Sequence, residues 1–87
     1  MEVASEFECV LKSLKNIDMD TLELPDNIKL DFYKFYKQAT MGDCNISEPY
    51  SIFFRDHAKW KAWDSIKGMS TEDAMKEYIN YYNNYIK

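Results

Sequence analysis

The sequence is poor in the residues that interrupt regular structure or build cofactor sites. It contains only two glycines, two prolines, two cysteines and one histidine among 87 residues. Two glycines are too few for the phosphate-binding loops of most nucleotide folds. Cys9 and Cys44 lack a CxxC or Cys/His spacing, so neither a zinc site nor a disulfide framework is predicted, and we expect reduced thiols.

Long apolar runs and an excess of positive charge are also missing. No run approaches the ~20 apolar residues of a membrane-spanning helix, and the first residues lack the basic and apolar regions of a signal peptide. Fifteen acidic residues against eleven basic ones give a net charge of −4, which disfavours DNA, RNA and anionic membranes as partners. We therefore expect a soluble, cytoplasmic protein with no nucleic-acid partner and no stable membrane insertion.

What the sequence does have is helical periodicity. Hydrophobic residues form 46% of the chain and recur at steps of three and four, which is typical of amphipathic helices. The chain length allows one domain, residues 1–87, and no stretch alternates like a strand. The pattern predicts an all-α bundle. Its four helices are expected from Val3 to about Asn16, from Asp26 to Met41, from near Ser51 to Lys67, and from Ser70 to the C-terminus.

Capping residues and irregular stretches divide these helices. Gly42 and Gly68 supply the conformation that ends a helix, and Ser70 is placed to cap the last one, with acidic residues in its first turn. Residues 17–25 and 44–50 have no clean period and are predicted to be connections.

The segment Tyr33 to Thr40 carries the most informative polar pattern. On a helix, Tyr33, Tyr36 and Lys37 share one surface, so two phenols and one ammonium project together. Such a surface suits a flat aromatic group with an attached phosphate. A pair of half-buried tyrosines beside a solvated lysine has the same pattern.

A second pattern is Lys59-Trp60-Lys61-Ala62-Trp63. Trp63 follows Lys59 by four residues and can lie under the lysine stem, whereas Trp60 points to another side. One tryptophan is then expected in the core and one at a rim, although both could be packing residues.

Recognisable catalytic patterns are missing. His57, the only histidine, has no neighbouring nucleophile or second metal ligand and is expected to be an exposed structural residue. A thioesterase or acyltransferase would need a base beside Cys9 or Cys44, and none is visible. A helical protein-interaction module that uses the tyrosines of the C-terminal tail is a further alternative.

Three segments, taken in order and spacing, resemble the acyl-CoA-binding protein family. They are YKFYKQATMGD at Tyr33–Asp43, AKWKAW at Ala58–Trp63, and STEDAMKEYI at Ser70–Ile79. The resemblance covers nearly the whole chain. It favours the ligand-binding interpretation of the tyrosine and lysine pattern over the alternative of simple packing.

The resemblance implies a four-helix, up-down-down-up bundle that binds medium- to long-chain fatty acyl-CoA esters. It implies a monomeric carrier and pool-former, without catalysis, cofactor or metal. The residues that it implies for acyl-CoA binding are Lys15, Tyr33, Lys34, Phe35, Tyr36, Lys37, Lys59 and Tyr78.

Individual roles also follow from the resemblance. Tyr33, Tyr36 and Lys37 would hold the adenine and the ribose 3′-phosphate, and Lys59 would close on the same phosphate from the neighbouring helix. Tyr78 would contact the ligand from the last helix. Lys15, counted from the aromatic Phe7, falls where the family keeps a phosphate-contacting lysine.

The chain departs from the family pattern at three places that bear on the apolar groove. Glu48-Pro49-Tyr50 stands where the family commonly has Arg-Pro-Gly, and Lys29-Leu30 stands where the family usually has two apolar residues. Leu11 replaces a small residue of the first helix. These departures leave the predicted head-group residues intact and affect the expected acyl-chain preference.

Overall fold

The computed structural model describes residues 2–15, 17 and 22–86. Within these ranges the chain forms helices and no strand, as the periodicity predicts. Asn16, the expected end of the first helix, and residues 18–21 of the expected first connection lie outside the described residues. The helices are α1 (Val3–Leu14), α2 (Asp26–Met41), α3 (Phe54–Asp64) and α4 (Thr71–Tyr85).

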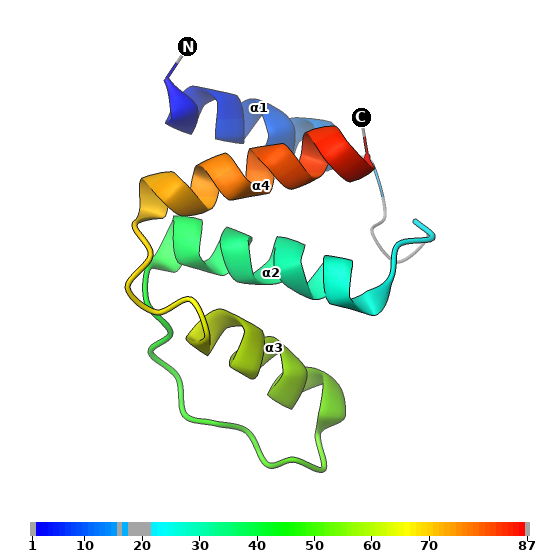
Figure 1. The fold of residues 1–87 in the computed structure, drawn as a ribbon, viewed down its shortest axis with the longest axis vertical. Coiled ribbons are helices and arrows are strands. Elements are labelled where there is room, and N and C mark those ends of the chain that lie inside the picture. Colours follow the sequence, from blue (N-terminus) through cyan, green and yellow to red (C-terminus); the bar gives the residue numbers. More distant parts are fainter. Residues whose placement is uncertain (1, 16, 18–21, 87) are drawn as a thin grey trace.

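The four helices lie side by side in the spatial order α1, α4, α2, α3 (Figure 1). In Figure 1, α1 and α4 run in one direction, and α2 and α3 run in the other. This arrangement is the up-down-down-up bundle that the family resemblance implies. The central pair, α2 and α4, therefore separates α1 from α3.

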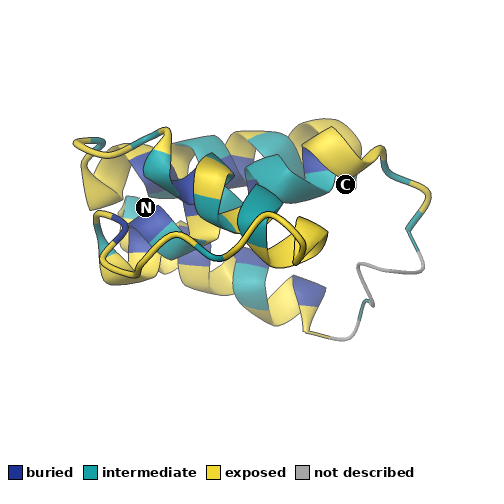
Figure 2. Ribbon diagram, turned by 90° about the horizontal axis from the view of Figure 1, so that it is seen from below, coloured by how far each residue is buried: buried dark blue, intermediate teal, exposed yellow. Residues whose placement is uncertain are grey.

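The apolar stripes of α1, α2 and α4 meet in the core. The apolar stripe that recurs every three or four residues along α2, formed by Ile28, Phe32, Phe35 and Ala39, is buried throughout (Figure 2). The rings of Phe7 and Phe32 each contact Tyr78 edge-on, with 5.4 Å between ring centroids, a geometry that aromatic pairs favour. The largest hydrophobic side chains of the core are Phe7, Phe32, Phe35, Trp63 and Tyr78.

Helix α3 is shorter than predicted and packs on α2 alone among the described helices. The prediction that it begins near Ser51 is wrong, because residues 51–53 form a turn in which the Phe53 N–H donates to the Tyr50 carbonyl. Ile52 and Phe53 continue the apolar period but are 73% and 53% exposed. Their spacing therefore continues the apolar period without extending the buried face of α3. Its C-terminal end is at Asp64 rather than Lys67.

A hydrogen-bond network around the buried Gln38 side chain joins the end of α2 to the α3–α4 connection. Gln38 is fully buried, and its Nε2 donates to Asp43 Oδ1 at 2.8 Å and to the Met69 carbonyl at 2.7 Å. The Gly68 N–H donates to the same carboxylate oxygen at 2.8 Å. Gly42 and Gly68, at φ of 80° and 97°, adopt the left-handed region, so the predicted helix stops are confirmed.

The predicted cap of α4 is also confirmed. The Ser70 hydroxyl oxygen accepts a hydrogen bond from the Asp73 N–H at 3.0 Å, which satisfies one of the free donors at the helix start. By contrast, neither α2 nor α3 has a hydrogen-bonding side chain at its N-cap, where Pro25 and Phe53 stand.

The Asp43 network predicts an acid-dependent loss of stability. Hydrogen bonds from the Gly68 N–H and from Gln38 hold the pKa of the Asp43 carboxyl below its ordinary value of 3.8. The stability that the ionised Asp43 carboxyl gives the folded state is therefore fully present above its unfolded-state pKa. This stability is lost as the pH falls through the folded-state pKa. We expect Asp43→Asn to reduce the fall in urea midpoint between about pH 7 and about pH 3.

The control for this prediction is Glu8→Gln, which removes an exposed carboxylate of α1. It should leave the pH dependence as in the parent. An unchanged acid profile in Asp43→Asn would contradict the assignment of the effect to this network.

Candidate functional site

A groove of about 410 Å³ opens between α2 and α3. Because the two helices run in the same direction, side chains that recur every turn on each helix line it together. Its lining consists of Asp26, Lys29, Leu30 and Tyr33 from α2, and of Phe54, Arg55, Ala58 and Lys59 from α3.

The groove combines apolar and cationic groups. Leu30, Phe54 and Ala58 supply hydrocarbon surface, and Phe54 is 81% exposed. The charged lining is three cations and one carboxylate, in a chain whose net charge is −4. The groove is therefore a local positive patch, as a site for an anionic ligand requires in an acidic protein.

Tyr33 and Lys59 meet across this groove. The Lys59 ammonium lies 5.4 Å from the centroid of the Tyr33 ring, within the range of a cation–π contact. Burial raises the pKa of the Tyr33 phenol, with further contributions from Cys44 and Asp56. The phenol is consequently protonated at neutral pH and can donate a hydrogen bond to a phosphate oxygen.

Lys37 lies one turn further along α2 and also faces α3. Its ammonium is 5.0 Å from the Trp63 ring centroid and 3.1 Å from Met41 Sδ. The sequence placed Lys59 over Trp63, but the structure puts Lys37 there and Lys59 over Tyr33. Within the described residues, no carboxylate forms an ion pair with either lysine, so their charges face no internal anion.

The two tryptophans divide as the sequence predicts. Trp63 is 1% exposed and donates its indole N–H to the Gly42 carbonyl at 2.9 Å. Trp60 is half-buried and donates to the Ile46 carbonyl at 2.9 Å. Each hydrogen bond links α3 to the connection that follows α2. The Trp63 ring also lies directly under the Lys37 ammonium.

Tyr36 and Tyr78 form a pair of phenols between α2 and α4. Their ring centroids are 6.3 Å apart. Tyr36 is 41% exposed, whereas Tyr78 is only 7% exposed. Burial, and then Tyr36, raise the pKa of Tyr78 to about 12.

Of the eight residues implied by the resemblance, only Tyr33 and Lys59 line the groove itself, and three others lie away from both the groove and the Tyr36–Tyr78 pair. The Lys34 ammonium pairs with Asp31 at 2.9 Å and lies 5.0 Å from the Phe35 ring centroid. Phe35 is 5% exposed and packs against Tyr81 of α4. Lys15 is exposed directly after α1. The structure therefore gathers Tyr33, Lys37 and Lys59 on the α3 side of α2.

Other lining residues were not assigned to a site from the sequence. They are Phe54, Arg55 and Ala58, which precede Lys59 within about one turn of α3, and Asp26, which lies in the first turn of α2. Helical spacing predicts which of these residues share a face of the same helix. It does not predict that residues of α2 lie opposite residues of α3, because this depends on the register between the two helices. His57, expected to be exposed, is half-buried, with Nε2 2.7 Å from Glu48 Oε2.

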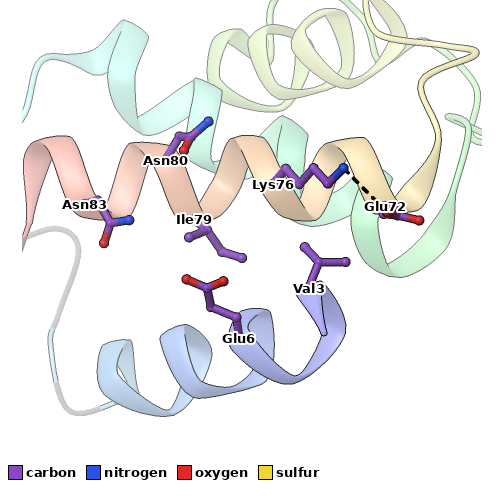
Figure 3. A pocket seen from close by; sticks show the side chains of 7 residues that line it. All are labelled: Val3, Glu6, Glu72, Lys76, Ile79, Asn80 and Asn83. Atoms are coloured by element: carbon purple, nitrogen blue, oxygen red, sulfur yellow. Dashed lines mark ion pairs between the residues drawn. The ribbon is translucent and has the colours of Figure 1, made fainter. Parts of the chain in front are cut away.

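A second cavity of nearly equal volume, about 420 Å³, lies between α1 and α4 (Figure 3). Val3 and Glu6 point into it from α1, and Ile79 and Asn83 approach from α4. Its only lysine, Lys76, is paired with Glu72 at 3.5 Å. With two acids against one paired lysine, this cavity does not suit a phosphorylated ligand.

Neither a metal cluster nor a bilayer span is found in the part of the chain that the structure describes. No three His, Cys, Asp or Glu residues there are grouped to hold a metal ion. None of its helices has the length and apolarity needed to cross a bilayer.

This chain belongs to the acyl-CoA-binding protein family, because the family model described as "Acyl CoA binding protein" matches residues 4–82. It is 50% identical over 74 residues to "Diazepam-binding inhibitor-like 5" of Rattus norvegicus, covering 85% of this chain and 82% of that protein. It is also 50% identical over 60 residues to "Acyl-CoA-binding protein" of Ricinus communis, covering 64% and 67% of the two chains.

Solved structures of the family have the same fold. The crystal structure of Oryza sativa Acyl-CoA-Binding Protein 2 aligns with a TM-score of 0.86 and 31% identity, covering 97% of this chain and 88% of that one. The crystal structure of ACBP from Moniliophthora perniciosa gives 0.84 and 34% identity over 93% and 77% of the chains. The family resemblance and the predicted fold class are confirmed.

The burial of Tyr78 predicts an alkaline loss of stability. The folded-state pKa of Tyr78, about 12, lies above the ordinary value of 10.0. The stability that the protonated phenol gives the folded state is therefore fully present below pH 10 and is lost as the pH rises through 12. We expect Tyr78→Phe to reduce the fall in urea midpoint between about pH 9 and about pH 11. Part of the fall remains, because burial and the hydrogen bond to Asp31 also raise the pKa of Tyr81 to about 12.

Tyr85→Phe is the matched control, since it removes an exposed phenol from the same helix. If the urea midpoint falls as much between about pH 9 and about pH 11 in Tyr78→Phe as in Tyr85→Phe, the Tyr78 phenol does not cause the alkaline loss of stability.

Proposed function

We propose that this protein binds medium- to long-chain fatty acyl-CoA esters and acts as a cytoplasmic, monomeric carrier and pool-former without catalysis. One observation carries the proposal: the α2–α3 groove places apolar surface beside the Tyr33 phenol and the Lys59 ammonium, and Lys59 forms no ion pair with a described residue. A fatty acyl-CoA ester has the matching halves, an oily chain and a phosphorylated nucleotide.

The two halves of the ligand have different energetic roles. Burial of each methylene contributes about 0.8 kcal/mol, so ~10 enclosed methylenes contribute on the order of 8 kcal/mol before ordering costs. Each charge-assisted contact to a phosphate contributes roughly 1.5–3 kcal/mol. The chain thus supplies much of the affinity, and the head group distinguishes the CoA ester from a free fatty acid.

The proposed head-group contacts come from three helices. Tyr33 and Tyr36 stack on the adenine or donate to phosphate oxygens, while Lys37 and Lys59 bind the ribose 3′-phosphate. The support is that Tyr33 and Lys37 both face α3, and that the Lys59 ammonium lies 5.4 Å from the Tyr33 ring centroid. Tyr78 contributes from α4, beside Tyr36.

The remaining proposed ligand residues act at the margins of the site. Lys15 adds a phosphate contact from the end of α1. Lys34 and Phe35 contribute from α2, although Lys34 is paired with Asp31 and Phe35 lies in the core. Their contribution is therefore expected to be smaller than that of Lys37 or Lys59.

The proposal predicts that the CoA moiety is required for tight binding. In isothermal titration calorimetry, palmitoyl-CoA should bind much more tightly than palmitate, because only the ester offers phosphates to the lysines. Unchanged palmitoyl-CoA after incubation would agree with the absence of catalysis. Equal affinity for the ester and the free acid would refute a CoA-binding site.

The lysine roles predict a specific loss of affinity. Lys37→Ala and Lys59→Ala should each weaken palmitoyl-CoA binding by about 1–3 kcal/mol, with little change in helical circular dichroism. Lys61→Ala, which removes an exposed lysine of α3 outside the groove lining, is the control and should bind like the parent. Parent-like binding by both Lys37→Ala and Lys59→Ala would mean that neither lysine holds the head group.

A further inference from the structure

The end of the groove away from Lys37 has an unusual lining. Since α2 and α3 run in the same direction, their N-terminal turns lie at the same end (Figure 1). Lys29 lies four residues before Tyr33 on α2, and Arg55 lies four residues before Lys59 on α3. Because Lys59 reaches the Tyr33 ring, one turn back along both helices places Lys29 and Arg55 in matching register.

The two cations at this end have little internal compensation. Neither Lys29 nor Arg55 forms an ion pair with a described residue. Asp26 is the one carboxylate in the groove lining, and Asp56 lies in the first turn of α3 outside it. Two cations therefore face one carboxylate at this end.

The helix ends add to the same positive potential. The first N–H groups of a helix carry no intrahelical bond and give its N-terminus a partial positive charge. Pro25 and Phe53, the N-cap residues of α2 and α3, make no side-chain capping bond, in contrast to Ser70 of α4. Two uncapped helix starts thus lie beside Lys29 and Arg55.

An acyl chain that ends in a methyl group does not match such a lining. It would desolvate the lysine and the guanidinium without giving either a partner, which is unfavourable. A carboxylate at the far end of the chain would instead accept charge-assisted hydrogen bonds from both, and Arg55 offers the planar fork that binds carboxylates with two bonds. Leu30, Phe54 and Ala58 still cover the methylenes between the two ends.

We propose that the groove accommodates acyl-CoA thioesters whose chain carries a terminal carboxylate, the monothioesters of dicarboxylic acids, with Lys29 and Arg55 binding that carboxylate. The inference rests on the proposed function and names the ligand class of the same groove. It makes Lys29, which departs from the apolar residues usual in the family, a specificity-determining residue.

The test compares matched thioesters with the full chain. Calorimetric titrations use dodecanedioyl-CoA against dodecanoyl-CoA, and hexadecanedioyl-CoA against palmitoyl-CoA, with the parent, Lys29→Met and the control Lys61→Met. The parent should bind the carboxylate-ended ester at least as tightly as its methyl-ended counterpart at one or both lengths. Lys29→Met should weaken the carboxylate-ended ester about tenfold and leave the methyl-ended one unchanged or tighter.

The methyl-ended esters also serve as the folding control, since a misfolded Lys29→Met protein would lose them as well. Lys61→Met should change neither ligand. If the parent binds methyl-ended esters tightly and carboxylate-ended ones at least tenfold more weakly at both lengths, the inference is wrong and the proposed function stands. If Lys29→Met remains folded by circular dichroism and weakens both ligand types equally, Lys29 contacts the CoA head group and the inference is wrong. If no ester binds, both proposals fail.

Discussion

The position of α2 between two different neighbours is the constraint on which the site depends. On one side, Phe32 and Phe35 pack against the tyrosines of α4 and form the core. On the other side, Tyr33 and Lys37 face α3, which contacts no other described helix. One helix thus contributes both to the stable interior and to an open groove, and residues adjacent in sequence serve opposite purposes.

Local charge placement lets an acidic chain present a cationic groove. The carboxylates are spread over all four helices and the connections, and several neutralise nearby lysines, such as Asp31 with Lys34 and Glu72 with Lys76. The lysines that face the groove are instead held over aromatic rings, Lys37 over Trp63 and Lys59 over Tyr33. A cation–π contact orients an ammonium without neutralising it, so these charges stay available to an anion.

Sequence reasoning succeeds where a feature is local to one helix. The apolar stripe of α2, the glycine stops and the Ser70 cap depend on spacing along the chain, and all are confirmed. It fails where the outcome depends on a partner in space. Phe53 fits the helical period but lies half exposed in the turn before α3, and the ring under Lys59 depends on the register of two helices. The family resemblance named Tyr33 and Lys59, but not Arg55.

Helix α3, like α1, packs on only one neighbouring helix among those described, so it can separate from α2 while the interface between α2 and α4 stays closed. Local opening of this kind exposes backbone to proteases, and a molecule bound between α2 and α3 suppresses it by mass action. Empty chains would then be degraded faster than occupied ones. The steady-state amount of this protein in a cell would therefore rise and fall with the supply of its cargo, without any change in synthesis.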